Sequence, residues 1–388
     1  MATGLQEKGK FRVLIAIVGA IFLSILAGTM LVRFSGVHIR FSGDGVGGGP
    51  QKFHAETTPR IGGVAILAGL IVGLALLASH GYLLGREALY LVLCILPVFA
   101  VGLAEDLTKR VSPRARLLGS FVAAGLAFWL LDAQLSRLDI PGIDLLFRVT
   151  PIALLVSVIC MGGVAHAVNI IDGYNGLAAG VGIIILGGLG FIGYQAHDML
   201  IFSMCAVSVG ALFGFLIVNF PSGSLFAGDS GAYLIGFLIA LVSVLLVARN
   251  PSVSAWCPML LAIYPVWETL FSIYRKKFLR GGSPNVPDGL HLHMLVYKRL
   301  VRFGAGQVLA THRTSRNSQT SPYLWLLTSV SVMPATLFWK STPLLVAFCV
   351  VFVLGYCEVY WSIVKFRSAK WLHRRILVAS PEVVESKI

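Results

Sequence analysis

The sequence predicts an all-α, multi-pass integral membrane protein, and three observations carry that prediction. Of its 388 residues, 57% are apolar and 12% are charged, whereas a soluble globular domain carries roughly 25% charged residues. The mean hydropathy is +0.84. Apolar stretches about as long as a bilayer span, roughly 20 residues, recur along nearly the whole chain. These features exclude a disordered chain, a disulfide scaffold and an ordinary soluble enzyme.

About eleven of these stretches are expected to form transmembrane helices. We expect a single polytopic domain over residues 1–364 and a basic tail over residues 365–388, with a long loop at 273–321. The expected spans are residues 13–32, 61–80, 88–104, 117–131, 150–168, 177–194, 199–218, 231–248, 256–272, 322–339 and 343–364.

The distribution of positive charge predicts the orientation of the chain. The loops after odd-numbered spans, together with the tail, hold 23 of the 31 Lys and Arg residues. Loops rich in Lys and Arg favour the cytoplasmic side, so we expect a periplasmic N-terminus and a cytoplasmic C-terminus. The net charge of +14 is then explained by anionic lipid headgroups, and no nucleic-acid partner is expected.

Polar side chains gather at the ends of the predicted spans. Charged groups at membrane depth are costly and usually functional. Four short segments at span ends, all on the predicted cytoplasmic side, concentrate carboxylates, amides and histidines. They are Gly102–Arg110, Asn169–Gly176, Asn219–Gly231 and Pro287–His293.

The first two segments admit both a plain and a functional interpretation. Glu105 and Asp106, followed by Lys109, are either a simple interfacial flank or a cation or proton site beside a phosphate-binding lysine. The second segment forms a tight turn from its Asp-Gly and Asn-Gly pairs. A turn needs neither Asn169 nor Asp172, and no Lys or Arg lies in the loop to neutralise the acid. A divalent cation would do so.

The last two segments also carry candidate ligands. Asp229 stands at a predicted helix start, where it can be an N-cap, a metal ligand or both. His291 and His293 do not share a helix face, and no nearby His or Cys completes a zinc set. They are either ordinary loop histidines or donors to a phosphate or nucleotide.

Taken together, these segments predict an Mg²⁺-dependent reaction at the membrane surface. Mg²⁺ prefers oxygen ligands and usually binds through one or two carboxylates plus substrate phosphates. Phosphoryl transfer depends mainly on positioning and charge neutralisation. A carboxylate cluster on one face, with cationic donors around it, suits a soluble phosphorylated substrate and a lipid acceptor.

Five motifs in order give the chain a family resemblance. They are His54-x3-Thr58-Pro59-Arg60-x-Gly62-Gly63, Glu105-Asp106-x-x-Lys109, Asn169-x-x-Asp172-Gly173-x-Asn175-Gly176-Leu177, Phe226-x-Gly228-Asp229-x-Gly231, and Pro265-x-x-Glu268-Thr269 followed by Pro287-Asp288-x-x-His291-Leu292-His293. Across roughly residues 50–300 the chain resembles the polyprenyl-phosphate N-acetylhexosamine-1-phosphate transferases. This bacterial glycosyltransferase family includes the UDP-MurNAc-pentapeptide translocases of peptidoglycan synthesis.

The resemblance implies an activity and a location. The activity is transfer of an N-acetylhexosamine-1-phosphate from a UDP-sugar, such as UDP-GlcNAc, to undecaprenyl phosphate. The products are undecaprenyl-diphospho-sugar and UMP. It would be the first membrane step of an O-antigen-like cell-envelope polysaccharide. The enzyme would lie in the bacterial inner membrane with its active site on the cytoplasmic face, and would use Mg²⁺, with Mn²⁺ as the alternative. A homodimer is compatible with it.

The resemblance also implies roles for individual residues. Asp229 and Asp172 would hold the metal ion, while Glu105 and Asp106 would lie by the lipid phosphate as ligand or proton acceptor; these four are the expected catalytic residues. Lys109 would steady the lipid phosphate, Asn169 and Asn175 would bind the nucleotide-sugar, and the histidines would contact its diphosphate. The expected substrate-binding residues are Arg60, Lys109, Asn169, Asn175, His291 and His293.

Four departures from the family pattern leave the sugar open. Glu105, Asn175 and Glu268 each stand where the family has Asp, and Met294 replaces its last His. The missing three-histidine pattern favours the N-acetylhexosamine branch. The alternatives are a 6-deoxy-N-acetylhexosamine or MurNAc-pentapeptide as substrate, or an ion-coupled transporter. Against a transporter, Glu358 is the one acid well inside an expected span, and no repeated halves are visible.

Overall fold

The computed structural model describes residues 2–44, 57–81, 85–279, 289–301 and 310–367, and within these the protein is all-α. The described residues form fourteen α-helices and two two-residue strands, β1 and β2, which pair antiparallel. The elements are α1 (Ala2–Arg33), α2 (Ser35–Ser42), β1 (Gly43–Asp44), β2 (Thr58–Pro59), α3 (Gly63–Ser79), α4 (Gly85–Thr108), α5 (Pro113–Leu130), the 3₁₀ turn η1 (Asp144–Arg148), α6 (Thr150–Ile171), α7 (Leu177–Gln195), α8 (Met199–Asn219), α9 (Gly228–Arg249), α10 (Trp256–Leu261), α11 (Ile263–Tyr274), the π-helical segment η2 (Arg275–Leu279), α12 (Leu292–Leu295), a second π-helical segment η3 (Val296–Val301), α13 (Ala310–Leu337) and α14 (Thr342–Val364).

Seven of the described helices are long and apolar enough to cross a membrane, which confirms a multi-pass membrane protein. They are the Phe11–Arg33 part of α1, then α4, α6, α7, α8, α9 and α14. The other four expected stretches fall on α3, α5, the pair α10–α11, and α13. Gly63–Ser79 is apolar but shorter. The total of eleven spans, the orientation, and the division at residue 364 therefore stay predictions.

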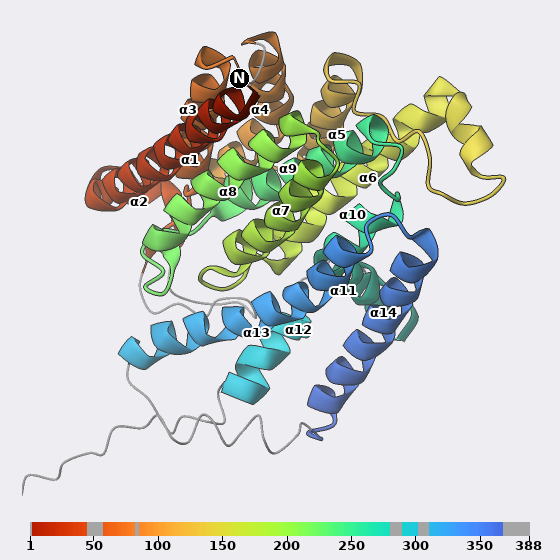
Figure 1. Ribbon diagram of the computed structural model, residues 1–388. Helices are drawn as coiled ribbons and strands as arrows, with labels where there is room; N and C mark the ends of the chain where they lie inside the picture. The colour runs from red at the N-terminus through yellow and green to blue at the C-terminus, as the bar shows by residue number, and fades with distance from the viewer. Residues whose placement is uncertain (1, 45–56, 82–84, 280–288, 302–309, 368–388) are drawn as a thin grey trace, which may run out of the picture.

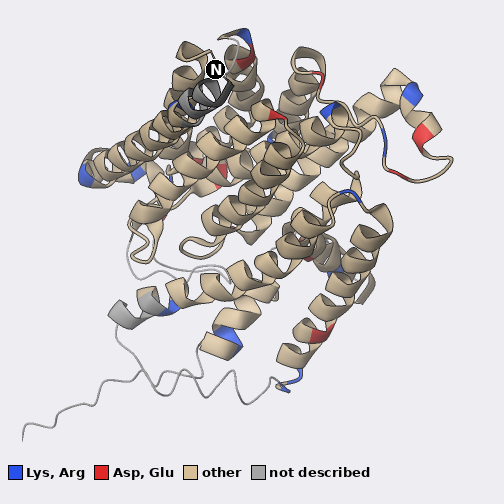
Figure 2. Cartoon of the chain, viewed as in Figure 1, with Lys and Arg blue, Asp and Glu red and all other residues tan. Residues whose placement is uncertain are grey.

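The helices form a main bundle with a second group along one side. Helices α1 to α9 make the bundle, and α11 to α14 lie beside it, with α13 packed against α7 and α11 against α6 (Figure 1). Lys, Arg, Asp and Glu cluster at helix ends and in loops, which leaves most helical surface uncharged (Figure 2). That distribution suits helices surrounded by lipid, because a charge at the bilayer centre is costly.

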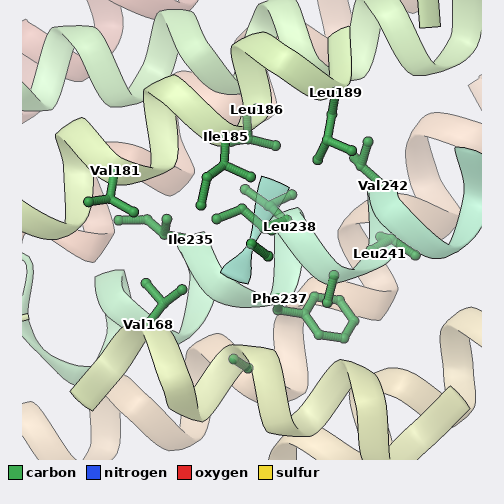
Figure 3. Packing of buried hydrophobic residues seen from close by; sticks show 14 of the residues in the cluster. Val168, Val181, Ile185, Leu186, Leu189, Ile235, Phe237, Leu238, Leu241 and Val242 are labelled. Atoms are coloured by element: carbon green, nitrogen blue, oxygen red, sulfur yellow. The ribbon is translucent and has the colours of Figure 1, made fainter. Parts of the chain in front are cut away.

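Helix α9 is the centre of the bundle and fixes the position of its own N-terminus. It contacts α3, α4, α5, α6, α7 and α8, and 89% of the residues in its most apolar 18-residue stretch are buried. Side chains of α9 such as Ile235 and Leu238 pack between Val168 of α6 and Ile185 of α7 (Figure 3). A helix that is apolar all round is expected to be buried all round, so Gly228–Ser230 at its start have little freedom to move.

Candidate functional site

The polar ends of four helices and the residue after β2 meet at one end of the bundle. Arg60 follows β2, Asp106 lies near the end of α4, and Arg116 lies near the start of α5. Asn169 lies near the end of α6, and Asp229 in the first turn of α9. Two carboxylates, two guanidinium groups and one amide are thus in mutual hydrogen-bond contact.

Asp229 is the acceptor at the centre of this cluster. Its Oδ1 accepts from Arg60 Nη2 at 3.1 Å and from Asn169 Nδ2 at 3.2 Å. Its Oδ2 accepts from Arg116 Nη1 at 2.5 Å. The residue is 8% exposed. Three chain segments far apart in sequence therefore converge on one buried carboxylate.

Asp106 caps helix α9 from outside that helix. Its Oδ1 accepts from Asp229 N at 2.8 Å and from Arg60 Nε at 3.2 Å. Its Oδ2 accepts from Ser230 N at 2.9 Å and Ser230 Oγ at 2.6 Å. A carboxylate offers about four acceptor positions, and all are in use. A negative charge also stabilises a helix N-terminus, so fully buried Asp106 has a structural role.

This arrangement corrects the expectation that Asp229 is itself an N-cap. Helix α9 begins at Gly228, and Ala227 before it makes no side-chain cap. The carboxylate of Asp229 is held by the two arginines instead, and the amides of the first turn go to Asp106.

Arg60 is positioned by backbone pairing on both sides. Arg60 N donates to Ser42 O at 2.9 Å, and Phe226 N donates to Pro59 O at 2.9 Å. At Gly228, where φ is +71°, a Cβ would lie 1.9 Å from Arg60 O, so only glycine permits this approach. Burial alone would lower the pKa of the Arg60 guanidinium, but the nearby carboxylates hold that pKa above its ordinary value.

Asp172, which follows α6 directly, is the carboxylate with the least support. It is half-buried, and among the described residues its side chain makes no hydrogen bond or ion pair. Burial, and then the charge of Asp229, raise the pKa of Asp172 from 3.8 to about 7, although Arg60 acts in the opposite direction. A half-buried carboxylate beside a second carboxylate, with no ion pair among the described residues, is suited to receive a cation.

The described residues do not form a complete set of protein ligands for a metal ion. Within the described ranges, no group of three or more His, Cys, Asp or Glu side chains is close enough to hold a metal. An ion here would draw on Asp172 and Asp229, with oxygens from water and substrate completing its shell. That division between protein and substrate ligands is typical of Mg²⁺.

Glu105 and Lys109 brace the loop after α4. Glu105 Oε2 accepts from Val111 N at 2.8 Å. The exposed Lys109 donates to Gly43 O of β1 at 2.5 Å and has a positive φ of 55°. The structure thus brings neither side chain into hydrogen-bond contact with Asp229 or Asp172.

Glu268 anchors the segment that carries the histidines. It is 1% exposed, and its Oε1 lies 2.9 Å from His291 Nδ1 and accepts from Leu292 N at 3.1 Å. Its Oε2 accepts from Tyr356 Oη at 2.6 Å. These bonds fix the segment between α11 and α14.

The two histidines reach the site from the side of the Asp172 turn. The rings of His291 and His293 stack with centroids 5.4 Å apart, and the ring of His293 lies edge-on to that of Tyr174 at 5.7 Å. A Cβ at Gly173 would lie 3.5 Å from His293 Nε2. His293 therefore neighbours residue 173, with His291 stacked on its ring.

The two asparagines of the second motif have different environments. Asn169 is in the cluster, donating to Asp229. Asn175 is buried, and its amide donates to Pro221 O at 3.1 Å and to Ser318 Oγ at 3.3 Å. His54, Pro287 and Asp288 of the motifs, and residues 368–388 of the basic tail, lie outside the described residues.

Two residues at the site, Arg116 in the cluster and Ser230 beside it, were not predicted from the sequence. Arg116 had a local signal. Cations are disfavoured at a helix N-terminus, yet the first turn of α5 contains Arg114 and Arg116 and no acid, which indicates a functional reason for the positive charge. Ser230 had no signal of its own, since its role depends on the approach of α4 to α9.

Comparisons with known proteins match the part of the chain that contains most of these residues. Residues 88–247 match the family described as glycosyl transferase family 4. That range contains Asp106, Arg116, Asn169, Asp172 and Asp229.

Individual relatives match over about two thirds of their own length or slightly less. One is a probable undecaprenyl-phosphate N-acetylglucosaminyl 1-phosphate transferase of Bacillus subtilis, 28% identical over 257 residues, 66% of this chain and 68% of the relative. Phospho-N-acetylmuramoyl-pentapeptide-transferases of Bacillus cytotoxicus and Bacillus mycoides are 29% and 30% identical over 208 and 209 residues. Those matches cover 51% of this chain and 64% of each relative.

Proposed function

Because the chain belongs to glycosyl transferase family 4, we propose that it transfers an N-acetylhexosamine-1-phosphate from a UDP-sugar to undecaprenyl phosphate. The observation that carries the proposal is the cluster of Arg60, Asp106, Arg116, Asn169 and Asp229. Beside it lies Asp172, whose carboxylate makes no hydrogen bond or ion pair within the described part of the chain. Asp229 and Asp172 supply carboxylates for a cation, and Arg60 and Arg116 supply guanidinium groups for phosphates, at the end of a membrane bundle.

In this reaction an oxygen of the lipid phosphate attacks the phosphorus that carries the sugar. The bond from that phosphorus to the bridging oxygen breaks, and UMP leaves with the bridging oxygen and its electron pair. At neutral pH a phosphate monoester is largely doubly ionised, so the nucleophile needs no base. Negative charge grows on the departing UMP, and Arg60 and Arg116 are the guanidinium groups of the cluster that can bind it.

A divalent cation fits the same reaction. Asp172 and Asp229 would hold Mg²⁺, or Mn²⁺ as the alternative, and the bound ion would supply positive charge to the diphosphate. Arg60 and Arg116 would then donate hydrogen bonds to phosphate oxygens instead of to Asp229. Asn169 would remain beside the sugar nucleotide.

We further propose that this end of the bundle faces the cytoplasm of a bacterial inner membrane. The support is the excess of Lys and Arg in the loops on that side. A product made there would be the first lipid-linked intermediate of a cell-envelope polysaccharide.

Transfer assays with several UDP-sugars test the function directly. Purified protein in detergent, with undecaprenyl phosphate and Mg²⁺, should release UMP and form a lipid-linked product with a UDP-N-acetylhexosamine. UDP-GlcNAc is the first choice, while 6-deoxy sugars and UDP-MurNAc-pentapeptide serve as the competing arms. No UMP release with any sugar would contradict the proposal.

The raised pKa of Asp172 predicts a pH-dependent affinity for the cation. A carboxyl group with a pKa of about 7 is roughly one-tenth ionised at pH 6 and nine-tenths ionised at pH 8, so Mn²⁺ should bind about tenfold more tightly at pH 8. Electron paramagnetic resonance of free Mn²⁺ measures this affinity. In Asp172→Asn the residual affinity should vary less over the same pH range, and an equal pH dependence would exclude Asp172 as its cause.

Ionisation of Asp172 affects folding stability in the opposite direction to cation affinity: affinity rises with pH, whereas the contribution of Asp172 to stability falls. The folded protein holds the Asp172 proton more tightly than the unfolded chain does, with a pKa of about 7 against 3.8. In metal-free protein this contribution to stability is fully present below pH 3.8 and is lost as the pH rises to about 7.

A further inference from the structure

The turn at Asn175 and Gly176 is hydrogen-bonded on each of its four backbone polar groups. Asn175 N donates to Asn317 Oδ1 at 2.7 Å, and Ser321 Oγ donates to Asn175 O at 2.5 Å. Gly176 N donates to Asn219 Oδ1 at 2.5 Å, while Trp325 Nε1 donates to Gly176 O at 3.1 Å. Three of these four partners lie on α13, a helix that is far from the turn in sequence. Helix α13 therefore holds the turn in place.

The three partners on α13 form one stripe. Asn317, Ser321 and Trp325 are spaced by four residues, so they lie on the same face of the helix. Asn317 and Ser321 are 4% and 0% exposed. Buried polar groups need partners, and here the turn provides them. Helix α13 lies outside the 88–247 range that matches the family.

Asp172 has no comparable support of its own. Its carboxylate makes no hydrogen bond among the described residues, whereas Asn175, three residues later, is bonded through backbone and side chain. The location of Asp172 is therefore set by the backbone on its two sides, the end of α6 and the held turn.

The side chain of Asn175 belongs to the same support. Its amide donates to Pro221 O and Ser318 Oγ, and the residue is 3% exposed. An aspartate at this position would have no proton to donate and would bring a charge against the Pro221 carbonyl. These two hydrogen bonds explain why position 175 carries an amide side chain.

We propose that Asn317, Ser321 and Trp325 of α13 are positioning residues that hold the turn and thereby place the Asp172 carboxylate for its cation, with Asn175 as part of the held turn rather than a contact to the nucleotide-sugar. This inference rests on the proposed function, because it takes Asp172 as a cation ligand.

Ser321→Ala tests the inference with little risk to folding, because it removes one hydroxyl and adds nothing. Ser329→Ala is the matched control: it makes the same change on the same helix, but the Ser329 hydroxyl donates to Trp325 O within α13. We expect Ser321→Ala to weaken Mn²⁺ binding about tenfold, as loss of a supporting contact around a metal site does. Amide hydrogen exchange in residues 173–177 should also become faster, while Ser329→Ala leaves both unchanged.

A second pair separates the hydrogen bond from general packing. Asn317→Ala removes the oxygen that accepts from Asn175 N, whereas Asn317→Asp keeps an acceptor at the same place. Asn317→Ala should reproduce the Ser321→Ala effects, and Asn317→Asp should restore both Mn²⁺ affinity and slow exchange.

The readouts separate failure of this inference from failure of the proposed function. Unchanged exchange in Ser321→Ala would show that α13 does not hold the turn, and faster exchange with unchanged Mn²⁺ affinity would show that the turn does not place Asp172. Either result overturns the inference. A parent protein that neither binds Mn²⁺ nor releases UMP would instead overturn the proposed function, and with it the assignment of Asp172 as a ligand.

Discussion

Asp229→Asn is expected to lower kcat for UMP release by about 10²–10³-fold, the loss typical when a key electrostatic group is removed from an active site. The substitution keeps the shape of the side chain but removes its charge. That charge is what holds Arg60 and Arg116 together in the cluster and what a divalent cation would bind.

The variant should remain folded, because other contacts keep its partners in place. Arg60 retains its ion pair with Asp106, and Arg116, whose side chain is 20% exposed, can turn toward water. The start of α9 keeps its cap, since the Asp229 backbone amide still donates to Asp106.

Asp198→Asn is the matched control for this variant. Asp198 is also 8% exposed and is also paired with an arginine, with Arg249 Nε 2.7 Å from its Oδ2. It directly precedes α8 and lies beside Arg249, at the end of α9 opposite to Asp229. Because the amide of Asp198→Asn also faces only donors, we expect this variant to lose some stability but to keep wild-type UMP release per folded protein. Size-exclusion profiles in detergent and Mn²⁺ binding should be compared for both variants, and full Mg²⁺-dependent activity in Asp229→Asn would remove that residue from the metal site.

The helices could be predicted because their signal is local. A run of about 20 apolar residues defines a span by its own composition, and all eleven expected stretches fall on helical segments. The meeting of Asp106, Asn169 and Asp229 could also be expected, because each stands at a span end on one predicted side. Their hydrogen bonds could not, since the closeness of α4 to α9 depends on small residues such as Gly102, where a Cβ would lie 2.6 Å from Ser230 Cα.

The second motif shows where sequence reasoning stops. Asn169 and Asn175 are the same residue type in the same motif, and both were expected to bind the nucleotide-sugar. One donates to Asp229, while the other is bonded to a helix whose contact residue lies 142 positions later. Only packing over that distance distinguishes them.

Asp106→Asn and Asp172→Asn are expected to fail in opposite ways, although both remove one carboxylate from the same region. In Asp106→Asn an amide NH₂ must face groups that are themselves donors, either the amides of α9 or Arg60. Breaking a buried charge pair in this way costs about 3–5 kcal/mol. The thermal midpoint in detergent should therefore fall sharply, and activity should be lost with the fold.

Asp172→Asn removes no hydrogen bond among the described residues and relieves repulsion from Asp229. Its thermal midpoint should equal or exceed that of the parent in metal-free buffer, while Mn²⁺ affinity and UMP release fall by about 10²-fold. The two variants together separate structure from chemistry at this site. An Asp106→Asn protein as stable as the parent but inactive would make Asp106 a catalytic group rather than a cap, and a fully active Asp172→Asn protein would leave the cation with Asp229 alone.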